Sequence, residues 1–220
     1  MLTGCATPPI QEAALPLVHP EAVEGRWHVI YFRYAWPKQS PPRWQLDTLI
    51  AHRVVAPVLK RYQGQIALWR FHRRAARDGA GHRLRFIFYA DDKVAASVIR
   101  DVETSSLLRA LQAGGWVESV NAGDFGAHSD RLLATSDPSW PTVVQNTWPY
   151  YIMGVSRAWL ELISSVEGGR TRSTRDVATL VRRYRSIDDE VSRIWRDFGQ
   201  HAYVHHLSGV FGYRPLEVRY

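Results

Sequence analysis

The chain has 220 residues, 45% hydrophobic and 22% charged, so it can bury a sizeable core as one large or two small domains. Its net charge of +7 comes from 28 Lys and Arg against 21 Asp and Glu. Lysine is nearly absent, so the positive charge is almost wholly arginine. The abundance of arginine favours an anionic partner, unless a coding bias toward arginine explains the composition. One cysteine, Cys5, excludes internal disulfides and Cys-based zinc fingers, and no apolar run is long enough to span a bilayer.

Residues 1–24 are rich in proline and show no periodicity, which predicts an extended arm or tether. The segment Leu2–Cys5 resembles the lipobox in which bacterial lipoproteins are acylated, but the charged and apolar segments that should precede it are missing. Either the start of the chain was trimmed or mis-assigned, or the match is accidental. As written, the sequence predicts a cytoplasmic protein; the alternative is a lipoprotein of the bacterial cell envelope, held at the membrane through Cys5.

Residues 26–36 form a run of aromatic and β-branched residues that predicts the first strand. Apolar residues then recur at helical spacing over 43–59, which predicts a helix with a kink at Pro57.

Apolar and polar residues alternate over 65–73 and again over 82–89, which predicts two strands. The sequence Asp-Gly-Ala-Gly at 78–81 is typical of a tight turn, so we expect these strands to form a hairpin.

A helical stripe runs from Val94 to Leu111 and ends at Gly114, and a short fourth strand is expected over 116–120. The order strand–helix–strand–strand–helix–strand over 26–120 is that of a ferredoxin-like α+β fold. Both helices should cover one face of an antiparallel sheet and leave the other face free for a ligand or a second layer.

The second half of the chain, 121–220, is expected to be mainly helical and to complete a single domain over 25–220. One apolar helix is predicted over 147–166. A second, amphipathic helix over 177–198 should begin with Ser173 as its N-cap and Asp176 completing a capping box.

Arginines are concentrated on the predicted hairpin. Alternation places Arg70 on one side of its strand and Arg73 on the other, and groups Arg83 with Arg85. Adjacent strands would then present several guanidinium groups that repel one another unless an anion binds them. The alternative is a solvated strand face paired with nearby aspartates.

Histidines cluster near the C-terminus at 201, 205 and 206. His201 and His205 have metal-ligand spacing on a helix, but without HExxH or further cysteines we predict no metal site. A single histidine acting as acid or base is favoured, because its pKa is nearest neutrality. The aromatic spacing does not match an RNA-recognition sheet, so no nucleic-acid partner is expected.

Three motifs in this order resemble the C-terminal elimination domain of lantibiotic dehydratases and its stand-alone relatives, the thiopeptide-type bacteriocin biosynthesis proteins. The motifs are Phe71–Arg73, His82–Phe86 and the His-rich segment His205–Gly212. The family usually has Asn-Arg where this chain has Ser208-Gly209.

The resemblance implies a lyase-type peptide-tailoring enzyme that eliminates glutamate from glutamylated Ser or Thr of a ribosomal precursor peptide, or a related dehydroamino-acid reaction, without a cofactor. It assigns catalysis to His206 and Arg73, and substrate binding to Arg70, Arg83 and Arg85. We expect these groups to share one pocket. The sequence is compatible with either a monomer or a homodimer. The alternative is a non-catalytic envelope lipoprotein that binds an acidic peptide or protein partner.

Overall fold

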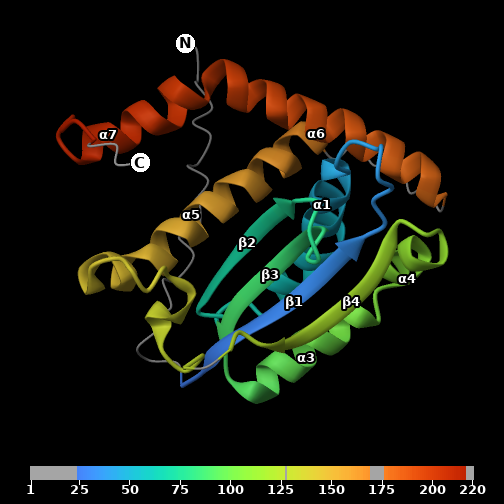
Figure 1. The fold of residues 1–220 in the computed structure, drawn as a ribbon, viewed down its shortest axis with the longest axis horizontal. Helices are drawn as coiled ribbons and strands as arrows, with labels where there is room; N and C mark the ends of the chain where they lie inside the picture. The colour runs from blue at the N-terminus through green and yellow to red at the C-terminus, as the bar shows by residue number, and fades with distance from the viewer. Residues whose placement is uncertain (1–23, 127, 169–175, 217–220) are drawn as a thin grey trace, which may run out of the picture.

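The computed structural model describes residues 24–126, 128–168 and 176–216 (Figure 1). Cys5 and nearly all of the predicted N-terminal arm lie outside these residues, so the lipobox remains a prediction. None of the described helices is both long and apolar enough to cross a bilayer.

The centre of the fold is a four-stranded antiparallel sheet with the strand order β2-β3-β1-β4. Its strands are β1 (Arg26–Tyr34), β2 (Leu68–Ala75), β3 (His82–Ala90) and β4 (Val117–Asp124). The hairpin predicted from the turn sequence is the β2–β3 pair. The α+β class and the ferredoxin-like strand order are therefore confirmed.

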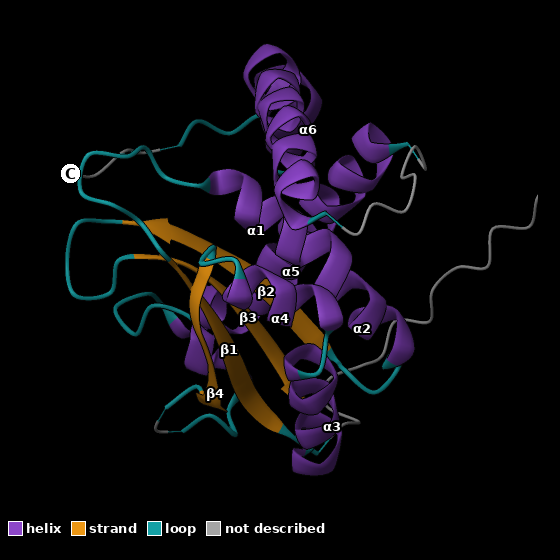
Figure 2. Ribbon diagram, turned by 90° about the vertical axis from the view of Figure 1, so that its right-hand side faces the viewer, coloured by secondary structure: helices purple, strands orange, loops and turns teal. Residues whose placement is uncertain are grey.

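The first helical layer covers one face of this sheet (Figure 2). It begins with α1 (Trp44–Ile50), which continues through a π-helical turn (η2, Ala51–Val55) into α2 (Ala56–Arg61). The π-helical turn lies immediately before Pro57, where the sequence predicted a kink. Proline lacks an N–H group, and a local change of helical hydrogen bonding accommodates that loss.

The second predicted helix is two helices, α3 (Asp92–Glu103) and α4 (Ser106–Ala113). The Ser105 hydroxyl accepts a hydrogen bond from the Leu108 N–H at 3.4 Å and caps α4, so the chain turns where a continuous stripe had been expected.

The remaining helices are α5 (Thr142–Glu167), α6 (Val177–Gly199), the π-helical η4 (Gln200–His205) and α7 (His206–Val210). Helix α5 packs along the outer edge of β2, where Ser156 accepts a hydrogen bond from the Phe71 N–H at 3.1 Å. Helix α6 packs on α1 (Figure 1). Asp176 itself caps α6, while Ser173 lies outside the described residues.

Alternation along the strands separates two cores. The larger core lies between the sheet and the helices and includes Phe32, Phe86 and Phe88, all fully buried. The smaller core, on the opposite face, contains Trp27 and Tyr89 and is covered by Phe125 and by the segment 128–135, which includes η3 (Leu132–Thr135). This segment covers only one end of the second face.

Candidate functional site

The β2–β3 register decides which arginines of the hairpin share a face. Arg73 lies opposite Leu84, whose side chain points into the helical core, whereas Arg74 lies opposite Arg83. Arg73 therefore faces the helices, and Arg83 and Arg85 face the other side of the sheet. The common pocket predicted for Arg73 with Arg83 or Arg85 is wrong, because the sheet separates them.

Arg73 is neutralised within the fold. Its Nε donates to Asp47 Oδ2 at 2.9 Å and its Nη2 to Asp188 Oδ1 at 3.2 Å. Its guanidinium also stacks on Trp44 and Trp159, 5.1 and 4.8 Å from their ring centres. Burial raises the pKa of Asp47, although the adjacent arginine opposes that rise. Arg73 thus joins β2 to α1 and α6, and the catalytic role predicted for it remains a prediction.

His82 is also part of the structure on this side. Its Nδ1 lies 3.0 Å from the Arg74 carbonyl oxygen and its Nε2 accepts from the Arg43 N–H at 2.9 Å. One ring nitrogen donates and the other accepts, so these hydrogen bonds fix the orientation of the ring. The ring is 1% exposed and cannot reach a ligand without unfolding its surroundings.

The opposite face carries an ordered array of cations, which we call the cationic face. Strand pairing places its residues in two adjacent rows across β2, β3 and β1: Arg74, Arg83 and Arg33 in one, and His72, Arg85 and Tyr31 in the next. Arg70 follows on β2, on the same side as His72. Like charges directly across a strand pair destabilise a sheet, so the array needs a compensating interaction.

The outer arginines of the cationic face have that compensation. Arg33 Nε donates to Glu118 at 3.1 Å, and Arg74 pairs with Asp78 in the hairpin turn. Within the described residues, no carboxylate forms an ion pair with the inner arginines Arg70, Arg83 and Arg85.

The inner arginines also have unused hydrogen-bond donors. The Nε atoms of Arg70, Arg83 and Arg85 are all buried and have no partner in the structure. Thr135 Oγ1, in the segment that borders this face, is likewise buried without a partner. Buried polar groups are nearly always paired, so several unpaired donors on one face indicate a site for an acceptor.

Burial and neighbouring charges lower the pKa values of Arg70 and His72 on the cationic face. Burial, with a smaller effect from Arg85, lowers the pKa of Arg70 to about 10. Burial also lowers the pKa of His72, and the neighbouring Arg85, Arg70 and Arg83 lower it further. His72 is therefore neutral at pH 7, with a free lone pair beside a positive array.

Aromatic rings and a loop position the guanidinium groups. Arg83 and Arg85 both lie 5.5 Å from the centre of the Tyr31 ring. Arg70, only 9% exposed, donates from Nη2 to the Thr135 carbonyl at 3.3 Å and lies 5.9 Å from the Phe125 ring. These contacts fix the orientation of guanidinium groups whose planar forks match the oxygens of a carboxylate or phosphate.

The structure does not bring His206 to the cationic face. This residue begins α7, and its ring neighbours are His201 and His205, each 5.8 Å away between ring centres. No group of three potential ligands among the described residues is arranged to hold a metal ion. The role predicted for His206 stays a prediction.

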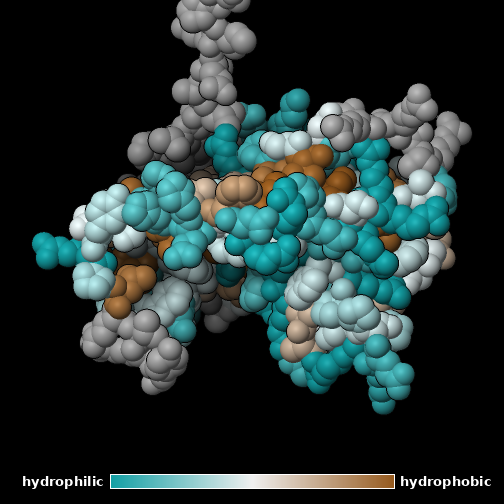
Figure 3. Space-filling view, turned by 90° about the horizontal axis from the view of Figure 1, so that it is seen from above, coloured by the Kyte–Doolittle hydropathy of each residue, from teal (hydrophilic) through white to brown (hydrophobic). Residues whose placement is uncertain are grey.

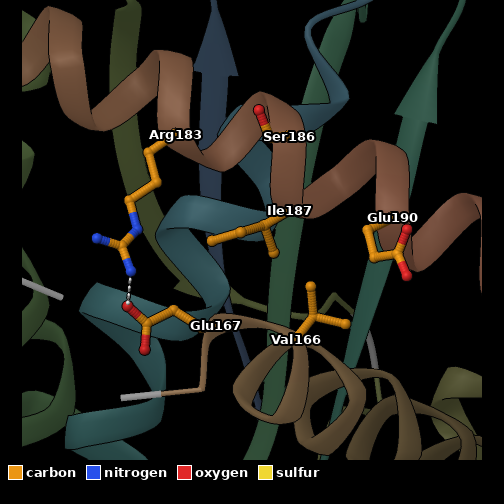
Figure 4. Close-up of a pocket in the computed structure, with 6 residues that line it drawn as sticks. All are labelled: Val166, Glu167, Arg183, Ser186, Ile187 and Glu190. Carbon is orange, nitrogen blue, oxygen red and sulfur yellow. Dashed lines mark hydrogen bonds and ion pairs between the residues drawn. The ribbon is translucent and has the colours of Figure 1, made fainter. Parts of the chain in front are cut away.

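A recess of about 610 Å³ lies between α5 and α6, away from the cationic face (Figure 4). Apolar Val166 and Ile187 line it together with Glu167 and Arg183, which form an ion pair at 2.9 Å. Because its charged groups already compensate each other, this recess is a weaker candidate for an anion than the cationic face.

Sequence reasoning missed His72 and Tyr31 as members of the site. Alternation along β2 puts His72 on the same side as Arg70, but only the register places it directly opposite Arg85. Tyr31 lies opposite Arg85 from the other side, on β1. The signal that could have found both is a polar residue or aromatic in a strand position facing away from the core.

Comparisons with known proteins add little to this geometry. No family model matches the chain, and a search of curated proteins found no match. Among solved structures, the chain is similar to the crystal structure of TsrL, with a TM-score of 0.41 and 14% sequence identity. The similarity covers 66% of this chain but only 37% of TsrL, so this chain spans well under half of that protein. So weak a likeness carries no argument about chemistry.

Proposed function

We propose that the chain is a peptide-tailoring enzyme whose cationic face binds the carboxylate of a glutamylated Ser or Thr and releases glutamate. The observation that carries the proposal is the set of three buried, unpaired guanidinium Nε atoms on Arg70, Arg83 and Arg85. The order of the sequence motifs, which resembles that of elimination domains, supports the choice of substrate.

In this reaction a base removes the α-proton, the Cα–Cβ double bond forms, and the Cβ–O ester bond breaks to release glutamate. The leaving carboxylate gains negative charge, which guanidinium groups that are already in position stabilise. His72 takes the place of His206 as the proton acceptor in this proposal. It lies opposite Arg85, and its lowered pKa keeps it neutral, the form that can accept a proton.

The test uses the full chain and a synthetic peptide with one glutamyl-threonine ester. Mass spectrometry should show loss of glutamate and formation of a dehydroamino acid. Arg85→Gln and Arg83→Gln should each slow the reaction by tenfold or more. The matched control is Arg33→Gln, on the same face but exposed and paired with Glu118, which should react nearly as fast as the parent.

The alternative function, binding of an acidic peptide without chemistry, rests on the same arginines. It predicts tight binding of the peptide, loss of binding in Arg85→Gln, and no release of glutamate at any pH. His72→Gln separates the two: it should abolish turnover but preserve binding in the enzyme, and change neither in a simple binder. If the peptide neither binds nor reacts, both functions are wrong.

A further inference from the structure

The C-terminal part of the chain is an exposed, aromatic-rich helical arm. We call residues 195–216, from the end of α6 through η4 and α7, the C-terminal arm. Within the described part of the chain, η4 and α7 make their substantial contacts only with each other and with the end of α6 (Figure 1). The arm therefore continues α6 without packing on the sheet.

This arm carries large hydrophobic side chains that are 39–90% exposed. They are Trp195, Phe198, Tyr203, Val204, Leu207, Val210, Phe211, Tyr213 and Leu216. Hydrophobic patches amid polar surface are visible in Figure 3, which views the molecule from above. The first four turns of α5 add further exposed apolar residues, including Val143, Tyr151 and Val155.

The amount of apolar surface fits a protein interface. At roughly 100 Å² for each half-exposed large side chain, the arm offers on the order of 900 Å². One partner in a standard interface contributes about 800 Å².

The charge of the arm favours a second copy of the same chain. The arm carries Arg196, Asp197 and Arg214 at its two ends, but no Asp, Glu, Lys or Arg occurs from Phe198 to Tyr213, and none occurs from Thr142 to Ser156 in α5. An acidic or basic partner would find no complementary charge here, whereas two identical uncharged surfaces can meet without repulsion. A twofold interface requires this kind of self-complementary patch.

The arm also needs a partner to remain helical. Most of the stability of a protein helix comes from packing of its apolar face, and short helices alone in water are marginal. Contacts within the arm, such as the stack of Trp195 on Tyr203 at 5.9 Å and the tilted contact of Tyr213 with His205 at 5.1 Å, leave Trp195 and Tyr213 more than half exposed. We propose that the C-terminal arm is a homodimer interface, with the arms of two copies packed against each other.

The experiment measures the mass of the full chain in solution by light scattering after size exclusion, at about 5 to 100 µM. The parent should have twice the 25.2 kDa of one chain. Phe198→Glu combined with Leu207→Glu should shift the mass to that of one chain, because it places charge in the apolar contact. The control is Gln200→Glu, which adds the same charge at an exposed polar position of the arm and should stay dimeric.

Far-UV circular dichroism and peptide binding at the cationic face report whether the double variant still folds. A parent that is folded but monomeric up to 100 µM overturns the proposal, as does a double variant that stays dimeric. A monomeric parent whose arm binds lipid vesicles would assign the arm to a membrane surface, and the homodimer would again be wrong.

Discussion

The two faces of the β2–β3 hairpin carry arginines in opposite states. On the helix side, Arg73 is held by two carboxylates and two aromatic rings. On the other side, Arg83 and Arg85 lie over one aromatic ring and form no ion pair with a carboxylate of the described residues. A single strand pair thus combines a completed ion-pair network with an incomplete one.

Because Arg73 is paired while Arg83 and Arg85 are not, the two faces should contribute differently to stability and to ligand binding. A buried cation that is paired contributes through the cost of breaking the pair, and its charge is already compensated before any ligand binds. A half-buried cation that lacks a partner lowers the stability of the free protein. An anionic ligand that pairs with it removes this cost, so the cation contributes to ligand affinity. We therefore expect changes on the helix side to affect unfolding, and changes on the cationic face to affect ligand affinity.

The largest effect should come from Arg73→Ala. The side chain of Asp47 is fully buried, and the substitution leaves it without its cation. Removing one partner of a buried pair typically costs about 3–5 kcal/mol, so the free energy of unfolding should fall by about that amount. Urea denaturation followed by tryptophan fluorescence measures it.

Arg193→Ala is the control for this prediction, since Arg193 forms its ion pairs with Glu190 and Asp197 on the exposed side of α6. It should change stability little. If Arg73→Ala were as stable as the parent and failed only in ligand binding, Arg73 would belong to the site and the comparison of the two faces would be wrong.

Arg85→Gln should have the opposite profile. Affinity for a carboxylate-bearing peptide should fall by roughly tenfold or more, because a charge-assisted hydrogen bond contributes about 1.5–3 kcal/mol. The free energy of unfolding without ligand should stay unchanged or rise by up to about 1 kcal/mol, because a like-charge contact is removed. Calorimetric titration and urea denaturation of the same preparation measure both. Loss of stability without loss of affinity would contradict the assignment.

The sequence predicted the faces within each strand but not the pairing between strands. Alternation correctly separated Arg70 from Arg73. A shift of one residue in register moves a whole strand to the other face of its partner, and the turn sequence did not specify which register forms. Arg73 was therefore grouped with Arg83 and Arg85, although it lies opposite Leu84.

The carboxylates that neutralise Arg73 could not be predicted from the sequence, for a related reason. Asp47 and Asp188 lie 26 and 115 residues from Arg73 along the chain, so no local pattern connects them to it. The order of strands and helices, in contrast, follows from local periodicity and turn residues, and the structure confirmed it. The break between α3 and α4 depends on one capping serine, Ser105, which the continuous apolar stripe concealed.

The pH dependence of stability should report on the cationic face, because His72 on this face changes its protonation when the protein unfolds in acid. The folded protein holds this histidine neutral, while the unfolded chain takes up a proton near pH 6.5. Below that pH the unfolded state binds more protons than the folded state. The contribution of His72 to the free energy of unfolding should therefore be constant above that pH and fall as the pH drops toward the pKa of His72 in the folded protein. The slope can reach at most about 1.4 kcal/mol per pH unit for one proton.

His28 and His52, whose pKa values burial also lowers, act in the same direction, so the readout is the difference between the parent and His72→Gln. The variant should lose less stability below pH 6.5. A saturating carboxylate ligand should shrink the difference, because it offsets the arginine charge around His72. Parallel pH curves for the parent and the variant would show that neither burial nor the arginines lower the pKa of His72 in the folded protein.

The smallest effect should come from Tyr31, whose ring lies beside both Arg83 and Arg85 on the cationic face. Cation–π contacts at half-exposed sites contribute about 0.5–1 kcal/mol, so Tyr31→Leu should weaken peptide binding only severalfold. Tyr31→Phe keeps the ring and should bind almost as well as the parent. Calorimetry on the three proteins separates the ring from the hydroxyl. If Tyr31→Phe loses as much affinity as Tyr31→Leu, the hydroxyl contacts the ligand directly. If neither substitution changes affinity, the ring does not orient the guanidinium groups, and the donors of this face are less preorganised than the geometry indicates.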